Sequence, residues 1–276
     1  MWIYETAERL FSSPDSLDVI LFSGIILVAF EALNYLTLHT QRWTTSTTPT
    51  IPVRGKHLDD LSIKDHLFIS LNKLATPPFT YLYLQFAWRS STPHTHMTLW
   101  NTLLPIPLLF LVYDLVYTLL HGMLHVPAIY SMVHKHHHQQ KAPSRANVDA
   151  VNVHPLEFFL GEYNHLLALY VVRTYFKIQV HCVAAIAFLA IGAMLTGWNH
   201  TRFDITWWFL YDSKVHDVHH RIPRSNYGQY TMIWDKVFGT FRPYDPMDRI
   251  QPEAQLDPKT GKSFNYVKSG IKKKES

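Results

Sequence analysis

The sequence predicts an all-α, polytopic membrane protein with four or five transmembrane helices and a cytosolic, histidine-rich helical cap. Long apolar stretches recur along the 276 residues, although the mean hydropathy of the whole chain is close to zero. Three histidine-rich motifs lie between or beside these stretches. The chain contains 18 histidines and a single cysteine, Cys182. Imidazole is therefore the abundant transition-metal ligand, and no disulfide forms within the chain.

Five apolar segments are candidate membrane spans, and their strengths differ. Residues 17–38 and 99–120 are long and apolar enough to cross a hydrocarbon core of roughly 30 Å. The segment 67–88 is weaker because it contains one lysine and two adjacent prolines. Residues 156–176 and 178–198 are predicted to form a helical hairpin, whose second helix is the more apolar. A hairpin returns the chain to the side of the membrane that it left, so the motifs before and after it share one face.

The charge pattern predicts which face this is. The linker 39–65 carries four cationic side chains, those of Arg42, Arg54, Lys56 and Lys64, whereas residues 90–98 carry none. By the positive-inside rule, the linker, the histidine motifs and the C-terminal tail are expected in the cytosol. Arg173 and Lys177, at the hairpin turn, count mildly against this orientation.

The chain is expected to have three parts. These are an N-terminal membrane segment and linker (1–98), a histidine-motif catalytic domain with its membrane hairpin (99–245) and a polar C-terminal tail (246–276). The net charge is +4, and the tail contributes Lys268 and the run Lys272-Lys273-Lys274. A basic tail on a hydrophobic chain fits an anionic membrane surface, and no nucleic-acid-binding motif is present. Nucleic acid is therefore not an expected partner.

Three histidine boxes carry most of the chemical information. The first reads HxxxH at 121–125, and the second and third read HxxHH at 134–138 and 216–220. Residues three and four apart share a helix face, so each box is predicted to direct two or three imidazoles one way. Eight imidazoles from three segments predict a metal site, with two ions rather than one. The eight are His121, His125, His134, His137, His138, His216, His219 and His220.

Two other kinds of metal site do not fit the sequence. A ferritin-like di-iron site needs two Glu-x-x-His motifs, and only Glu162-Tyr-Asn-His165 is present. The HExxH motif of zinc proteases is missing.

The order HxxxH, HxxHH, HxxHH, with a hydrophobic hairpin between the last two, resembles the fatty acid hydroxylase/sterol desaturase superfamily. The likeness runs from Asp114 to Pro243. It includes the elements His-Pro-Leu-Glu at 154–157, Asn199-His200 and Asn226-Tyr227-Gly228, and the run Trp234 to Thr240.

The resemblance implies an enzyme of the endoplasmic reticulum membrane that contains two iron ions. Such an enzyme uses O₂ to hydroxylate or desaturate an unactivated C–H bond of a lipid that enters from the bilayer. Electrons come from NAD(P)H through a reductase, usually with cytochrome b5, and a separate donor protein is expected here because no haem domain is fused. The terminal Lys273-Lys274-Glu275-Ser276 resembles a dilysine retrieval signal, which acts on a cytosolic tail.

The resemblance also bears on residues beside the boxes. His200 corresponds to the Asn-His element and is predicted as a ninth ligand, the alternative being a capping or interface histidine. His154 has two open roles: a ligand, or part of a helix break at Pro155 that orients Glu157. His136 is predicted not to be a ligand, and no catalytic residue is expected beyond the ligands. Six carboxylates are candidate acceptors for ligand N–H groups: Asp114, Asp149, Glu157, Glu162, Asp204 and Asp217.

The function favoured by these features is a membrane-bound, di-iron, O₂-dependent lipid hydroxylase or oxidase that acts on a sterol or related lipid. One alternative is a desaturase or epoxidase built on the same metal core. An alternative of another class is a non-catalytic metal-binding membrane protein. That alternative predicts charged or histidine residues along the spans, which offer little beyond Glu31 and Asp114.

Overall fold

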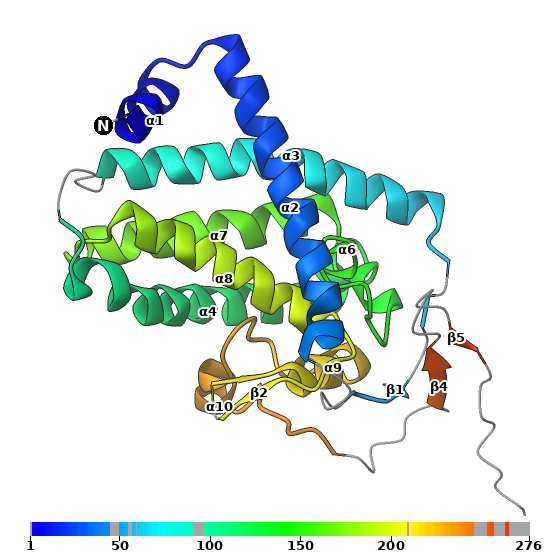
Figure 1. The fold of residues 1–276 in the computed structure, drawn as a ribbon. Helices are drawn as coiled ribbons and strands as arrows, with labels where there is room; N and C mark the ends of the chain where they lie inside the picture. The colour runs from blue at the N-terminus through cyan, green and yellow to red at the C-terminus, as the bar shows by residue number, and fades with distance from the viewer. Residues whose placement is uncertain are drawn as a thin grey trace, which may run out of the picture.

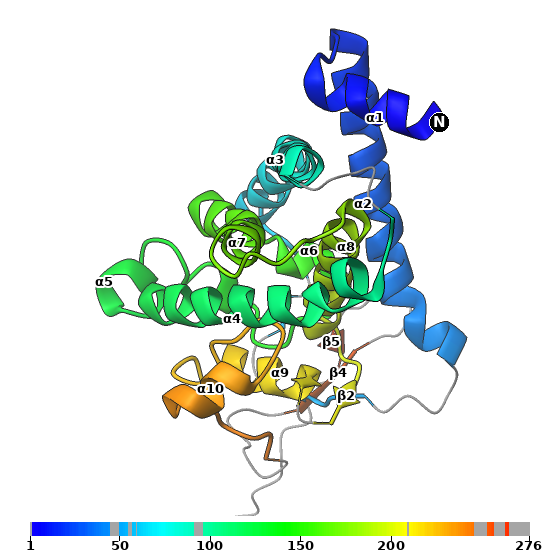
Figure 2. The same cartoon turned by 90° about the vertical axis from the view of Figure 1, so that its left-hand side faces the viewer.

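The framework of the chain consists of five long helices: α2 (Ser16–Thr44), α3 (Ile63–Ser90), α4 (Pro105–Leu124), α7 (Pro155–Thr174) and α8 (Cys182–Asn199). The computed structural model describes residues 2–44, 50–54, 57–58, 60–90, 96–208, 210–245, 253–256 and 263–264. Helices α7 and α8 each pack against both α3 and α4, and α2 packs against α3 and α8 (Figures 1 and 2). The predicted all-α class is confirmed.

Shorter elements connect this framework and cap one end of it. They are α1 (Trp2–Ser12), the π-helical turn η1 (Leu99–Leu103), α5 (Pro127–Tyr130), the 3₁₀ turn η2 (His137–Gln139), α6 (Asn147–Ala150), α9 (Ser213–Arg221) and α10 (Ile233–Phe238). Figure 2 shows α9 and α10 together below α4. The cap therefore follows the last long helix in the chain and lies at the end of the framework.

Two small antiparallel sheets complete the described chain. Strand β2 (Thr206–Trp207) pairs with β3 (Tyr211–Asp212) in the connection between α8 and α9. Strand β1 (Val53–Arg54) pairs with β4 (Glu253–Leu256), which pairs in turn with β5 (Ser263–Phe264). The segment predicted only as a polar tail thus contributes two strands, and it joins the linker between α2 and α3.

Several helix boundaries follow from local chemistry. Proline occupies the first turn of α4 and of α7, where its missing N–H has no intrahelical partner to lose. The side chain of His154 accepts a hydrogen bond from the Leu156 N–H at the start of α7, and Asp212 caps α9 in the same way by accepting from the Lys214 N–H.

Among the described residues, three segments are long and apolar enough to cross a membrane: Ser16–His39, Leu99–Leu124 and Cys182–Asn199. They correspond to the three stronger predicted spans, and the chain is a membrane protein. Helices α3 and α7, with 28 and 20 residues, cover the two weaker ones but are less apolar. The number of four or five crossings stays a prediction.

One buried carboxylate holds the loop after α9 against the helical framework. Asp114, on α4, is fully buried and accepts hydrogen bonds from the backbone N–H groups of Gln229, Tyr230 and Thr231. Because it satisfies three buried donors at once, Asp114 fixes the position of this loop. The same loop brings the Tyr227 carbonyl to the first histidine box.

Candidate metal centre

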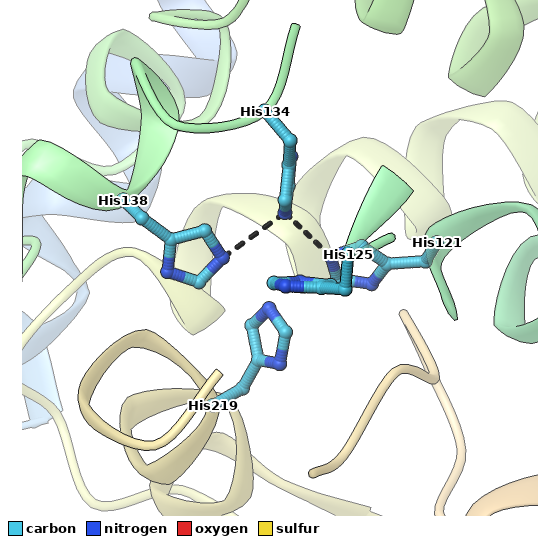
Figure 3. Close-up of side chains that lie close together, drawn as sticks. All are labelled: His121, His125, His134, His138 and His219. Atoms are coloured by element: carbon cyan, nitrogen blue, oxygen red, sulfur yellow. Dashed lines mark hydrogen bonds between the residues drawn. The ribbon is translucent and has the colours of Figure 1, made fainter. Parts of the chain in front are cut away.

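The three boxes and His200 come together as two compact groups of histidines. Within each group, one ring nitrogen of every member lies within 4.8 Å of those of the others. The five-histidine group contains His121, His125, His134, His138 and His219 (Figure 3). The four-histidine group contains His137, His200, His216 and His220. All nine predicted ligand residues therefore belong to one group or the other.

Each HxxHH box divides its histidines between the two groups. In the third box, His216 and His220 belong to the four-histidine group and His219 to the five-histidine group. On α9, residues four apart lie on one face, and the residue between them at position i+3 is rotated away. The second box divides in the opposite sense, since His134 and His138 join the five-histidine group. Each box thus directs two imidazoles to one group, as expected, but the third histidine of each HxxHH box joins the other group.

The second box also lacks the α-helical conformation assumed for it. Residues 131–136 form turns, and the 3₁₀ turn η2 covers only residues 137–139. The tighter 3₁₀ winding rotates consecutive side chains by about 120°, so His137 and His138 diverge toward different groups.

The Nδ1 atoms of five group members are held by hydrogen-bond acceptors. His121 donates to the Tyr227 carbonyl at 2.8 Å, and His134 donates to the Glu157 carboxylate at 2.7 Å. The remaining three donate to backbone carbonyls: His200 to Thr196, His219 to Ser225 and His220 to Gln140. A carbonyl only accepts, so the Nδ1 atoms of His121, His200, His219 and His220 carry the hydrogen and their Nε2 atoms keep a bare lone pair. The same holds for His134 when Glu157 is ionised as a carboxylate.

Two of these lone pairs face each other at His121 and His134, and those of His200 and His220 both face a third ring, His216, whose Nδ1 has no acceptor in the described chain. The Nε2 atoms of His121 and His134 lie 3.0 Å apart, although neither has a hydrogen to donate when Glu157 is ionised. In the four-histidine group, His216 Nε2 lies 3.3 Å from His200 Nε2 and 3.1 Å from His220 Nε2. Ligand nitrogens about 2.1 Å from a shared metal are about 3.0 to 3.4 Å apart in octahedral or tetrahedral geometry. The donor sets therefore fit metal ions.

Buried ring nitrogens without partners give an independent indication. The Nε2 atoms of His125 and His219 are buried and have no hydrogen-bond partner among the described residues. Leaving two such polar atoms unsatisfied is costly, whereas a shared ion satisfies both.

The surroundings keep the imidazoles neutral, as metal ligands must be. Burial lowers the pKa of His134 to about 3. Burial, followed by the proximity of other imidazoles, lowers the pKa of His138, His219 and His220 well below the usual range.

Only one of the six candidate carboxylates, Glu157, accepts a hydrogen bond from a group member within the described chain. Asp114 holds the 229–231 loop, Asp149 binds the Ser144 and Arg145 backbone N–H groups, and Asp204 pairs with Lys214. Sequence reasoning missed the four carbonyl acceptors, because a backbone oxygen has no signature in the sequence.

Two further histidines, His154 and His136, lie outside both groups. The sequence left the role of His154 open and predicted that His136 is not a ligand. His154 is the N-cap of α7, directly before Pro155, and its ring accepts a hydrogen bond from the Leu156 N–H. His136 lies 2.9 Å from Asn152 Oδ1 and 3.1 Å from Asp65 Oδ1, through its Nε2. Neither is within reach of the shared ligand positions.

A buried ionic network anchors the third box. Asp217 pairs with Arg202 at 2.7 Å and with Arg221 at 3.0 Å, and all three side chains are buried. Arg202 also donates to the carbonyls of Ile51 and Pro52, before β1. The network thus connects α9 to the linker after α2, and its charges are paired rather than isolated.

A cavity of about 190 Å³ opens onto the four-histidine group. Three members of that group, His137, His200 and His216, line it, and no member of the five-histidine group does. Its apolar walls come from four of the long helices and the segment before α7, through Phe30, Phe79, Val151, Val153, Phe158 and Leu189. One histidine group is therefore directly accessible to an apolar ligand.

The fold and the site together define a membrane protein with a buried polyhistidine centre beside an apolar cavity. Residues 106–240, which contain all nine grouped histidines, match the family model described as fatty acid hydroxylase. The chain belongs to the fatty acid hydroxylase/sterol desaturase superfamily. No solved structure shows a significant match.

Similar curated proteins include desaturases, hydroxylases and oxidases. The Delta(7)-sterol-C5(6)-desaturase of Nicotiana tabacum is 29% identical over 131 residues, which are 47% of this chain and 45% of that protein. Fatty acid hydroxylase ahd1 of Mycosarcoma maydis is 31% identical over 131 residues, 47% and 31% of the two chains. Lathosterol oxidase of Mus musculus is 25% identical over 170 residues, 59% and 53%. The chain spans about half or less of the length of these relatives.

Single replacements in the two groups are expected to remove metal separately. Purified His138→Ala should lose about one metal ion per chain from the five-histidine group, and His220→Ala about one from the other, because each loses a ligand. Elemental analysis beside wild type measures this. His136→Gln, in the same box but in neither group, is the control and should retain both ions. An unchanged metal content in both alanine variants would contradict the assignment.

Acid is expected to destabilise the metal-free protein. Because folding lowers the pKa of His134 from 6.5 to about 3, the unfolded chain binds protons that the folded chain excludes. Stability is therefore full above about pH 6.5 and decreases as the pH falls toward about 3. Thermal unfolding after chelation, recorded from about pH 7.5 to about pH 4.5, should show a falling midpoint. In His134→Gln, the unfolding midpoint should fall less steeply with decreasing pH than in wild type. The same pH dependence in both proteins would contradict a lowered pKa for His134 in the folded state.

Proposed function

We propose that this protein is a membrane-bound, di-iron, O₂-dependent hydroxylase or oxidase of a sterol or related lipid. The observation that supports this most directly is the cavity, which is lined by three members of the four-histidine group and by apolar side chains from four long helices. A purely structural metal site has no need of such an opening. A non-catalytic metal-binding protein is for the same reason the weaker alternative.

The residues of the chain have definable tasks in this proposal. The two histidine groups hold the irons, and iron so bound supplies the redox chemistry by which O₂ oxidises a C–H bond. The Nδ1 acceptors fix the orientation of the ligand rings, Glu157 acting through His134 and the Thr196 carbonyl through His200. The apolar wall excludes water and positions a hydrocarbon segment of the substrate beside the four-histidine group.

Desaturation on the same metal core is the second candidate. It is favoured by the similarity to a protein named as a sterol desaturase, whereas another relative is named as a fatty acid hydroxylase. The two reactions make different products: a hydroxylase transfers an oxygen atom from O₂ to the lipid, and a desaturase removes two hydrogens. Epoxidation also transfers oxygen and is recognised by the structure of the product.

We further propose that electrons from NAD(P)H arrive through cytochrome b5, its reductase, or both, and that the protein resides in the endoplasmic reticulum membrane. The boxes and the C-terminus then face the cytosol. The lysines of the retrieval-like signal lie outside the described residues. A C-terminal epitope tag should be removed by protease added to intact microsomes; protection of the tag until detergent is added would contradict this orientation.

The activity itself is tested with purified, iron-loaded protein, a reductase system and isotopically labelled O₂. Wild type should convert a component of a membrane lipid extract to a product that carries the label, or to one that lacks two hydrogens. His137→Ala should lose turnover by at least about 100-fold, because His137 belongs to the group that lines the cavity. His136→Gln should remain active. Absence of any product from reduced wild type that holds both irons would contradict the proposal.

A further inference from the structure

One part of the cavity wall, separate from the histidine groups, is polar and has no task in the proposed metal chemistry. It is formed by Tyr113 on α4, Glu162 and His165 on α7, and Tyr230 in the loop after α9, and is called the polar subsite below. All four residues line the cavity. Glu162 and His165 are the pair whose Glu-x-x-His spacing stands out in the sequence, yet neither belongs to a histidine group.

The hydrogens of the polar subsite are already used by groups within the protein. The Tyr113 hydroxyl donates to the Gly161 carbonyl at 3.2 Å. His165 Nδ1 lies 3.1 Å from the Glu162 carbonyl oxygen, which can only accept, so this nitrogen carries the ring hydrogen. The neutral ring then accepts, at Nε2, the hydroxyl hydrogen of Tyr230 at 2.9 Å. Three potential donors therefore have no hydrogen left for a ligand.

The carboxyl group of Glu162, by contrast, keeps its acceptor capacity. Across the described chain it makes neither a hydrogen bond nor an ion pair with another side chain, although Glu162 faces the cavity. The cavity lining contains no lysine or arginine. A ligand that complements this wall supplies a hydrogen-bond donor to the Glu162 carboxyl, whereas an anionic head group placed beside Glu162 would meet a second acidic group and no lysine or arginine.

Helix α8 approaches the polar subsite closely, and a glycine allows this. A Cβ atom at Gly192 would lie 2.7 Å from Tyr230 Oη and 3.4 Å from His165 Nε2. A larger residue would displace the Tyr230 hydroxyl from His165. The hydrogen bond from the Tyr230 hydroxyl to His165 Nε2 therefore depends on the absence of a side chain at residue 192.

We propose that the polar subsite binds an uncharged hydroxyl group of the lipid, which donates its hydrogen to the Glu162 carboxyl. The lipid is then an alcohol rather than a fatty acid anion or a phosphorylated lipid. This rests on the proposed function only in calling the lipid a substrate.

The experiment measures equilibrium binding rather than turnover, with the full-length, detergent-purified protein. The probes form two series: cholesterol with its methyl ether, and 1-octadecanol with 1-methoxyoctadecane and stearate. In at least one series wild type should bind the alcohol about tenfold more tightly than the ether, which cannot donate a hydrogen bond. Stearate should bind more weakly than octadecanol.

Three variants test which residues cause the tighter binding of the alcohol than of the ether. Glu162→Leu should abolish the difference between alcohol and ether, whereas Tyr230→Phe should retain it, because that change only exposes a further acceptor at His165 Nε2. Thr80→Val, which removes a hydroxyl from the α3 wall of the same cavity, is the matched control and should leave it unchanged. Metal content should be the same in wild type and all three variants, since none alters a histidine group. Retained metal also verifies that each variant is folded.

Two results would overturn the inference: no preference for the alcohol in either series, including no binding of any probe, or a preference that persists in Glu162→Leu. Failure of the proposed function gives a different result. In that case wild type would hold no iron, or would yield no product in the turnover assay, while the preference for the alcohol and its loss in Glu162→Leu would still be measurable.

Discussion

The structure depends on nine imidazoles, eight buried and His125 half-buried, whose ring nitrogens converge on two positions. Neutral rings in this arrangement repel one another, since pairs such as His121 and His134 bring bare Nε2 atoms to 3.0 Å. Two cations would convert that repulsion into ligation, and the neutral state favoured by burial is the state that binds metal. Metal binding and folding of the cap are therefore expected to be coupled, with the hydrogen-bonded Nδ1 atoms defining where each ion sits.

The rest of the fold serves to hold these rings in place. Helix α4 carries the first box at its end, α8 delivers His200, and α9 carries the third box. Asp114 holds the 229–231 loop, and the Asp217 network ties α9 to the linker before β1. The second box supplies histidines to both groups, and it does so through a turn and a 3₁₀ conformation. This conformation therefore contributes to the site as much as the regular helices on either side.

Sequence reasoning identified the residues of the centre better than their arrangement. The spacing of the boxes located eight histidines, and the family resemblance added His200, because ligand spacing is a local property of the chain. The division of each HxxHH box between two groups was not foreseen, since it depends on how η2 and α9 are oriented toward each other. The carbonyl acceptors have no signature in the sequence. The polar subsite joins residues from three segments, and only Glu162 and His165 are close enough in sequence to be noticed together.

The central claim is that the chain holds two metal ions, one in each histidine group. Anomalous X-ray scattering at the iron edge, from crystals of the iron-loaded protein, tests it most directly. The account predicts two separate peaks, one enclosed by His121, His125, His134, His138 and His219 and the other by His137, His200, His216 and His220. A single peak, or peaks outside these groups, would contradict it.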